Sequence, residues 1–255
     1  MKIHGCAYLV GGCVLLASSL VSAYVLLNPE RTWSEAPTYI VDNRGLASIT
    51  DGDGGVSATV NAITSNNAWN GAGATGPVVY ARSGLVDGWQ LGDGIPMLNF
   101  EDPTGQCTGS CLAATFTGFY ERVGRGKNRK YRIYDADIVT NDAYNWTSES
   151  ETDGCSGEFY IEGVQVHEVG HGLGLGHTSV SGATMYPSVP ACNNGPATIE
   201  SDDVAGLCAL YGCDGGDSGG GSSACTLGQA GDSCTENNQC CSGKCRGKSN
   251  NKSCR

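Results

Sequence analysis

Apolar and polar residues are spaced along the chain in a way that predicts a mixture of strands and helices. Runs of β-branched and aromatic residues bounded by turn formers predict strands at residues 38–42, 77–81, 96–100, 112–119 and 131–139. Apolar residues at helical spacing predict helices at residues 56–69, 159–173 and 201–211. Strands and helices arranged around one long buried helix indicate an α+β domain.

The first segment of the chain has a different pattern. No charge occurs from Cys6 to Leu27, and small residues at 21–23 suit a signal peptidase, so we expect a secretory signal at residues 1–23. The alternative is an uncleaved anchor, because 22 uncharged residues are long enough to span a membrane. Scattered glycines and serines favour cleavage, and both interpretations place the remainder outside the cytosol.

The last part of the chain is set off by composition. Residues 214–224 are almost all Gly, Ser and Asp and read as a flexible linker between a domain at 24–213 and a small one at 225–255. The first holds 9 basic and 22 acidic residues, and the second holds 5 and 2. The net charge of -11 argues against nucleic acid and, after signal cleavage, against a membrane as partner. We expect a monomer.

Cysteine usage agrees with export. Of 14 cysteines, 12 follow the predicted signal, six in each domain, and even numbers in an exported chain indicate disulfides. Six cysteines allow fifteen pairings, which the sequence leaves open. Our trial pairing for the larger domain joins Cys107 with Cys111, Cys155 with Cys192, and Cys208 with Cys213.

The run from residue 167 to 177 carries the candidate chemistry. It reads H-E-x-x-H-x-x-G-x-x-H. His167 and His171 lie four residues apart, so on a helix their imidazoles share one face and can share a metal. Glu168 projects beside that face, where it can reach a metal-bound water. His177 can join only if the chain turns back, and Gly174 is the residue type that ends a helix in a left-handed conformation.

Three imidazoles indicate a catalytic zinc site, because they leave the fourth position of the metal open. The chain has four histidines, and the fourth, His4, lies in the predicted signal. Because Glu168 projects beside the helix face that carries the histidines, it is the expected general base. Gly163, Gly170 and Gly172 make the helix a poor intrinsic one. Metal binding is one way to hold it, and we expect the metal-free protein to melt at a lower temperature.

These residues resemble the metzincin clan of zinc endopeptidases, and specifically its matrixin branch. Residues 183–187 (Ala-Thr-Met-Tyr-Pro) are similar to the matrixin Met-turn, residues 201–212 to its C-terminal helix, and residues 132–142 to the strand before the active-site helix. The resemblance implies a twisted mixed sheet with a long active-site helix and zinc held by His167, His171 and His177. It also implies Met185 as an apolar floor, Pro187 as a pocket wall, and an edge strand near 112–119 that pairs with a peptide or protein substrate.

The chain also departs from that pattern. No histidine remains for the second, structural zinc of animal matrixins, and no pro-region with a latency cysteine fits between Ala23 and the first strand. Calcium at Asp135, Asp137 and Asp142 is an open alternative. The acidic loop around Asp51 has the look of a calcium loop, although a helix cap is the better interpretation.

The six C-terminal cysteines resemble the knottin or cystine-knot framework, which implies pairing of 225 with 241, 234 with 245, and 240 with 254. Such a module binds a surface or protein ligand, or serves as a passive cap. We therefore expect a secreted zinc endopeptidase with a knottin-like appendage. The rival hypotheses are a toxin-like binding protein that uses the first domain as a scaffold, and a hydrolase of non-protein amides.

Overall fold

The structure, a computed structural model, describes residues 24–74, 76–86, 91–121, 131–151 and 154–213, together with the backbone of two strands near the C-terminus. The predicted signal, the linker and the knottin pairings lie outside these residues. The two strands, β11 (Cys245–Lys248) and β12 (Asn251–Cys254), form an antiparallel pair. Within the described residues, no helix is long and apolar enough to cross a membrane.

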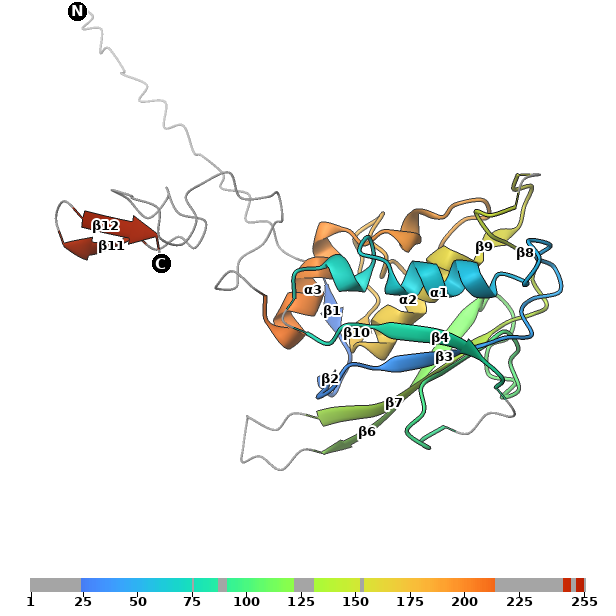
Figure 1. The fold of residues 1–255 in the computed structure, drawn as a ribbon, viewed down its shortest axis with the longest axis horizontal. Helices are drawn as coiled ribbons and strands as arrows, with labels where there is room; N and C mark the ends of the chain where they lie inside the picture. Colours follow the sequence, from blue (N-terminus) through green and yellow to red (C-terminus); the bar gives the residue numbers. More distant parts are fainter. Residues whose placement is uncertain are drawn as a thin grey trace, which may run out of the picture.

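A six-stranded mixed sheet forms the base of the larger domain (Figure 1). Its strands β4 (Tyr80–Gly84), β3 (Thr38–Asp42), β5 (Met97–Asn99) and β7 (Tyr131–Thr140) run parallel in that order, and β2 (Arg31–Trp33) pairs in parallel with the start of β7. The antiparallel strand β6 (Ala113–Glu121) lies on the other side of β7 and leaves its outer edge unpaired among the described strands. The domain thus presents one free antiparallel edge.

Two helices cover one face of this sheet (Figure 1). Helix α1 (Val56–Thr64) contacts β3 and β4, and α2 (Ile161–Gly172) contacts β6, β7 and α1. The core lies between helices and sheet and includes fully buried Tyr39, Leu98, Ile138 and Trp146. A third helix, α3 (Ser201–Tyr211), begins with a capping box between Glu200 and Asp203. The α+β metzincin-type fold expected from the sequence is confirmed.

Short elements connect these units. A 3-10 turn follows α1 at Trp69–Gly71, and another lies at Gly195–Ala197. The strand pair β8 (Trp146–Thr147) and β9 (Phe159–Tyr160) leads into α2. Strand β10 (Leu175–Gly176) follows α2 and pairs with β1 (Val25–Leu26).

The sequence predicted the main elements with shifts at their ends. Helix α1 ends at Thr64 rather than at residue 69, because the chain continues as a separate 3-10 turn. Strand β4 is displaced by three residues from the predicted 77–81, and residues 159–160 form a strand rather than the first turn of α2. Propensity located these segments, but tertiary pairing set their boundaries.

The glycines of α2 have packing partners that the sequence could not reveal. A Cβ at Gly170 would lie 2.3 Å from Met185 Sδ and 2.5 Å from the Trp69 ring, and one at Gly172 would lie 2.2 Å from the Tyr39 hydroxyl. The helix therefore uses glycine where neighbouring side chains approach its backbone. Packing, as well as any metal, stabilises this poor helix former.

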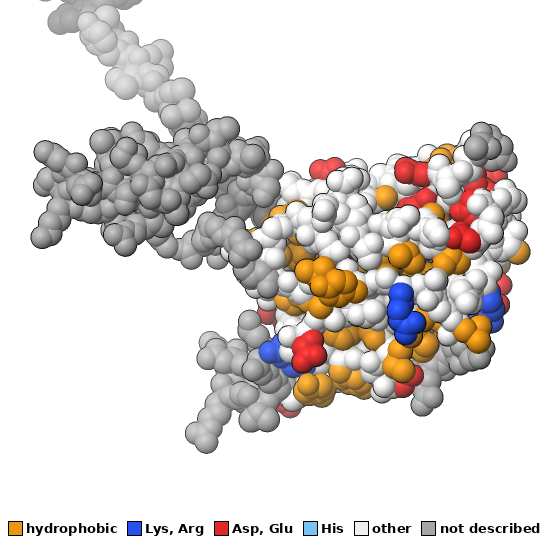
Figure 2. Space-filling model, in the orientation of Figure 1, with side chains coloured by type: hydrophobic (Ala, Val, Ile, Leu, Met, Phe, Trp, Pro, Cys, Tyr) orange, Lys and Arg blue, Asp and Glu red, His pale blue; other side chains and the backbone are white. Residues whose placement is uncertain are grey.

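The trial disulfide pairing is confirmed: Cys107–Cys111, Cys155–Cys192 and Cys208–Cys213 are bonded. Acidic side chains gather at the end of the molecule where β8 and β9 lie (Figure 2). There the Thr50 hydroxyl donates to Glu151, and Ser148 donates to Asp51. Asp51 also accepts from the Gly55 amide just before α1, and Asp53 accepts from the Ser57 amide in its first turn, in agreement with the interpretation of this loop as leading to a helix cap.

Candidate active site

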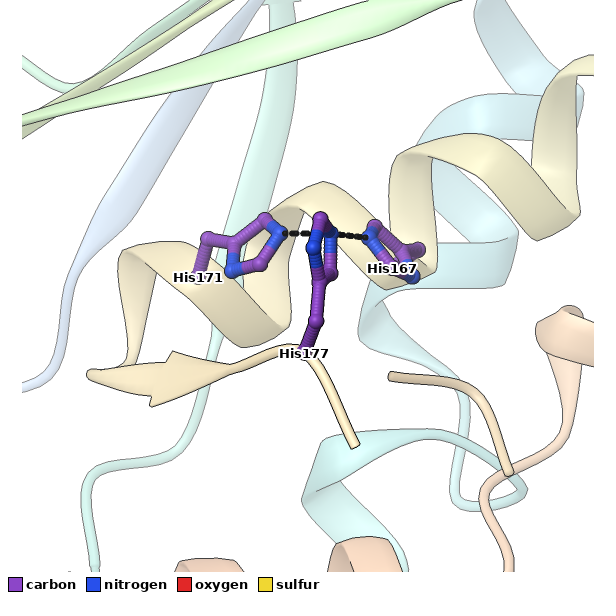
Figure 3. Close-up of side chains that lie close together, drawn as sticks. All are labelled: His167, His171 and His177. Carbon is purple, nitrogen blue, oxygen red and sulfur yellow. Dashed lines mark hydrogen bonds between the residues drawn. The ribbon is translucent and has the colours of Figure 1, made fainter. Parts of the chain in front are cut away.

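Helix α2 and the turn after it bring the three motif histidines together (Figure 3). His167 and His171 project from one face of the helix, one turn apart. The helix ends at Gly172, and Gly174 takes a φ of 107°, which sends the chain back through β10. His177 follows β10, and its ring lies between the other two.

Backbone carbonyls fix the orientation of two of the rings. His167 Nδ1 lies 2.6 Å from the Thr184 carbonyl oxygen, and His171 Nδ1 lies 2.8 Å from that of Leu175. Since a carbonyl only accepts, each Nδ1 carries the proton and each Nε2 presents a lone pair. This is the outer hydrogen bond that metal-binding imidazoles usually make.

The free nitrogens of the three rings converge on one point. His177 Nε2 lies 3.2 Å from His167 Nε2 and 3.1 Å from His171 Nε2. Tetrahedral zinc with bonds of about 2.0–2.1 Å needs nitrogens separated by about 3.3 Å. The spacing of the three nitrogens therefore fits zinc.

The environment favours neutral imidazoles, which is the form that binds metal. Burial lowers the pKa of His171. Burial, and then the nearby His171, lowers the pKa of His177. The site can therefore accept a metal without first losing protons at neutral pH.

The other predicted site residues surround the histidines. Glu168 is 5% exposed, and its Oε2 accepts a hydrogen bond of 2.6 Å from the Thr115 hydroxyl on β6. Met185 is buried against α2 at Gly170, and Gly170 lies between the two helical histidines in the sequence. Its amide donates to Asp203 and its carbonyl accepts from the Thr178 amide, which ties the Met-turn to the residue after His177.

A cavity of about 560 Å³ opens beside His167 and Glu168. Its walls come from the start of β6, from α2 and from the segment that follows Met185. Apart from the site itself, the lining is uncharged and comprises Ser110, Cys111, Leu112, Ala113, Tyr144, Phe159, Gly163, Val164, Tyr186, Pro187, Ser188, Val189 and Pro196. Its volume is that of a site for a bulky side chain or a small ligand.

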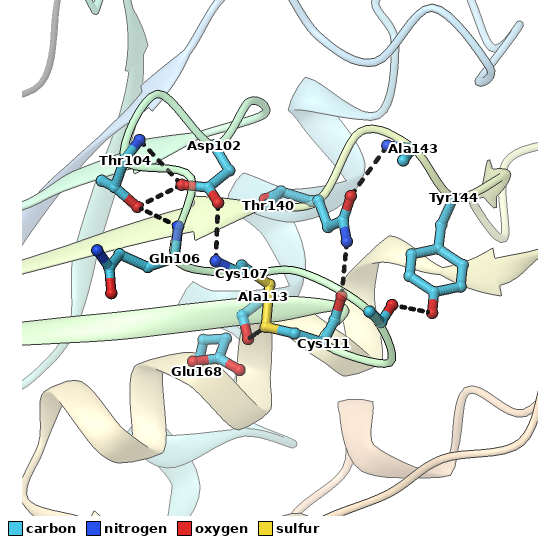
Figure 4. Close-up of a disulfide and its surroundings, with 12 residues drawn as sticks. Asp102, Thr104, Gln106, Cys107, Cys111, Ala113, Thr140, Ala143, Tyr144 and Glu168 are labelled. Carbon is cyan, nitrogen blue, oxygen red and sulfur yellow. Dashed lines mark hydrogen bonds between the residues drawn. A yellow bond between two sulfur atoms is a disulfide. The ribbon is translucent and has the colours of Figure 1, made fainter.

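The Cys107–Cys111 disulfide supports one rim of this cavity (Figure 4). The Asn141 side chain donates to the Cys111 carbonyl, and the Tyr144 hydroxyl donates to Gly109. The sequence predicted Pro187 as a wall, but it did not identify Tyr144, Phe159 or Thr115. Thr115 and Tyr144 lie far from the motif in sequence, and nothing local marks Phe159, which lies only eight residues before His167, as a cavity residue.

The predicted calcium residues do not assemble in the same way. Asp135 and Asp137 are buried on β7, whereas Asp142 is exposed in the following turn. Among the described residues, they belong to no group of three His, Cys or acidic ligands whose donor atoms lie within 4.8 Å of one another. Calcium binding there stays a prediction.

Comparisons with known proteins agree with this geometry. Residues 123–212 match the family model for matrixin. The chain is 40% identical over 70 residues to metalloendoproteinase 4-MMP of Arabidopsis thaliana, covering 28% of this chain and 20% of that protein. It is 39% identical over 71 residues to matrilysin of Rattus norvegicus, covering 28% and 27%, and 48% identical over 54 residues to metalloendoproteinase 1 of Glycine max, covering 21% and 17%.

The matched segments span about a fifth to a quarter of these relatives' length. The matched family region contains all three histidines, Glu168 and the Met-turn. It also includes β7, α2 and α3, on which the fold of the domain depends. This chain carries a matrixin-like catalytic domain.

Proposed function

We propose that the protein is a secreted zinc-dependent endopeptidase that hydrolyses peptide bonds of extracellular proteins. One observation carries this proposal: three imidazole nitrogens, two of them on rings held by backbone carbonyls, converge beside a carboxylate that lines a largely apolar cavity. The matrixin-like domain and metalloendoproteinase relatives support the same reaction class.

His167, His171 and His177 would hold the metal. Bound zinc lowers the pKa of its water to about 7 and polarises a carbonyl. The carbonyls of Thr184 and Leu175 keep two of the rings in the tautomer that can bind it. The buried Met185 packs against α2 between them and keeps this side of the site apolar.

Glu168 has the position of a general base. It follows the first histidine on α2 and lines the cavity, so it can take a proton from the attacking water. The same carboxylate can then pass this proton to the leaving amine. A carboxylate here has no equivalent role in a domain that serves only as a scaffold.

The cavity and the free strand edge indicate how a substrate binds. An extended peptide can pair with the outer edge of β6, as peptides do with exposed sheet edges. The side chain after the cleaved bond would then enter the cavity. Because its lining away from Glu168 and the histidines is uncharged and mostly apolar or aromatic, we expect a large uncharged side chain there.

The division into a signal at 1–23, a peptidase domain at 24–213, a linker at 214–224 and a knottin-like module at 225–255 belongs to this proposal. The three disulfides of the larger domain support an oxidising destination. A surface or protein ligand of the last module stays a prediction.

Digestion of a peptide library by the full chain tests the function. We expect cleavage before large apolar residues, complete loss with a zinc chelator, and recovery when zinc is restored. Cleavage that persists after thorough chelation, or no cleavage of any peptide by the zinc-loaded protein, would contradict the proposal. Cleavage before charged residues would contradict the assigned cavity.

A further inference from the structure

We propose that Thr115 is a positioning residue, which holds the Glu168 carboxylate in place by a hydrogen bond from its hydroxyl. This inference rests on the proposed peptidase function. It assigns a role to a residue on the substrate-binding strand rather than in the zinc motif.

The geometry of the contact is specific. Thr115 Oγ1 lies 2.6 Å from Glu168 Oε2 and 2.9 Å from the Glu168 carbonyl oxygen. The hydroxyl carries a single proton, and the shorter distance, to the carboxylate, is typical of a charge-assisted hydrogen bond. Thr115 therefore contacts both the backbone and the side chain of one residue, which limits where that carboxylate can lie.

The hydrogen bond gives the two carboxylate oxygens of Glu168 different environments. Oε2 is engaged by Thr115, whereas Oε1 accepts no hydrogen bond from any described residue and is not among the buried atoms that lack a partner. Glu168 lines the cavity, so Oε1 is the oxygen left accessible to water there. Anchoring one oxygen directs the other toward the reacting water, as preorganised catalytic groups require.

The contact also joins the two elements that the reaction must align. Thr115 lies on β6, two residues after Ala113, which lines the cavity beside Glu168 (Figure 4). Glu168 lies on α2. A substrate paired with β6 is therefore placed relative to the base by the same residue that orients the base.

Three variants of the full chain, produced in the bacterial periplasm, test the role. Thr115→Val keeps the shape and removes the hydroxyl, and we expect kcat to fall about 10- to 100-fold with KM within about twofold. Thr115→Ser restores a hydroxyl, and we expect kcat within about threefold of the wild type. The control is Thr147→Val on β8, which removes another 2.6 Å bond from Thr to Glu, at Glu151, a residue that does not line the cavity; we expect kcat unchanged.

Zinc affinity, measured by competition with a chelator, provides a readout besides activity, and we expect Thr115→Val to equal the wild type. The proposal is overturned if Thr115→Val keeps wild-type kcat, if Thr115→Ser fails to restore it, or if the valine variant loses zinc. It is also overturned if Thr147→Val shows the same loss of kcat, since the cause is then general destabilisation. An inactive zinc-loaded wild type contradicts the peptidase function itself, whereas an active wild type with an equally active valine variant contradicts only Thr115.

Discussion

Two groups of ionisable side chains lie on opposite sides of β7 and differ in what they can do. The histidines of α2 and Asp135–Asp137 are each brought together by the fold. Ala136 faces α2, where it lies 3.5 Å from a Cβ built at Gly172, so the flanking aspartates point to the other face of the sheet. The histidine group opens onto the cavity of about 560 Å³.

The aspartates have fixed partners and unused atoms. Asp135 accepts from the Gly92 amide and Asp137 from the Met97 amide, but Asp135 Oδ1 and Asp137 Oδ2 are buried with no hydrogen-bond partner among the described residues. Burial, followed by the charge of Asp135, raises the pKa of Asp137 to about 7. The two groups therefore differ in donor geometry: the three histidine nitrogens converge, whereas the aspartates join no group of three candidate metal ligands among the described residues.

The largest expected effect is the loss of peptidase activity when Glu168, beside the histidines, is changed, compared with a change at the aspartates. Glu168→Gln should lower kcat/KM by about 10²- to 10⁴-fold, because an amide cannot accept the proton from water. Glu162→Gln, at another buried glutamate of α2, and Asp137→Asn should each leave turnover within about twofold. Assays of zinc-loaded proteins on one peptide would measure this, and activity retained in Glu168→Gln would remove the distinction between the groups.

Metal removal should produce the next largest effect. With free zinc at about 100 times its Kd, binding adds about 2.7 kcal/mol to the free energy of unfolding, or about 5–10 °C in Tm for a domain of this size. Calorimetry before and after chelation measures the change. His177→Ala is the control, because it should melt at the same temperature with and without zinc. Equal melting temperatures for the wild type would show that the histidines hold no stabilising metal.

The smallest expected effect concerns the aspartates. Since the pKa of Asp137 rises from its ordinary value of 3.8 to about 7, the folded protein retains a proton that the unfolded chain releases in that range. The free energy of unfolding therefore decreases as pH rises through this window. Asp137→Asn does not titrate, so its gain in the free energy of unfolding over the wild type should be larger at pH 8 than at pH 5.

Urea unfolding at the two pH values, with zinc saturating, measures that difference. Comparison with the variant cancels the titration of the histidines, which both proteins share. Asp142→Asn, in an exposed turn, serves as the control and should follow the wild type. A gain in Asp137→Asn that does not depend on pH would contradict the assigned proton.

The sequence revealed the chemistry of the site because that chemistry is local. Two histidines one helix turn apart and a glycine at a left-handed position determine where the imidazoles point, and the structure brings the three rings together. The three disulfides of the larger domain were also anticipated, although spacing alone left other pairings open.

Contacts between segments that are distant in the chain could not be predicted from the sequence. The bond from Thr115 to Glu168 spans 53 residues, and Trp69 reaches α2 across 97 residues to donate to the Val166 carbonyl. From the sequence, the glycines of α2 only lower its helix propensity. In the structure, they allow Met185, Trp69 and Tyr39 to pack closely against the helix backbone. Such reasons arise only when sheet, helix and Met-turn are packed together.

The Cys155–Cys192 bridge has a consequence for selectivity. It joins the approach to α2 with the chain that leaves the wall at residues 186–189, and the Cys192 amide also donates to the Glu158 carbonyl. The disulfide therefore holds the cavity wall at a fixed distance from the start of α2. Because this wall cannot move away from the helix, we expect the cavity to exclude substrate side chains that are larger than its volume.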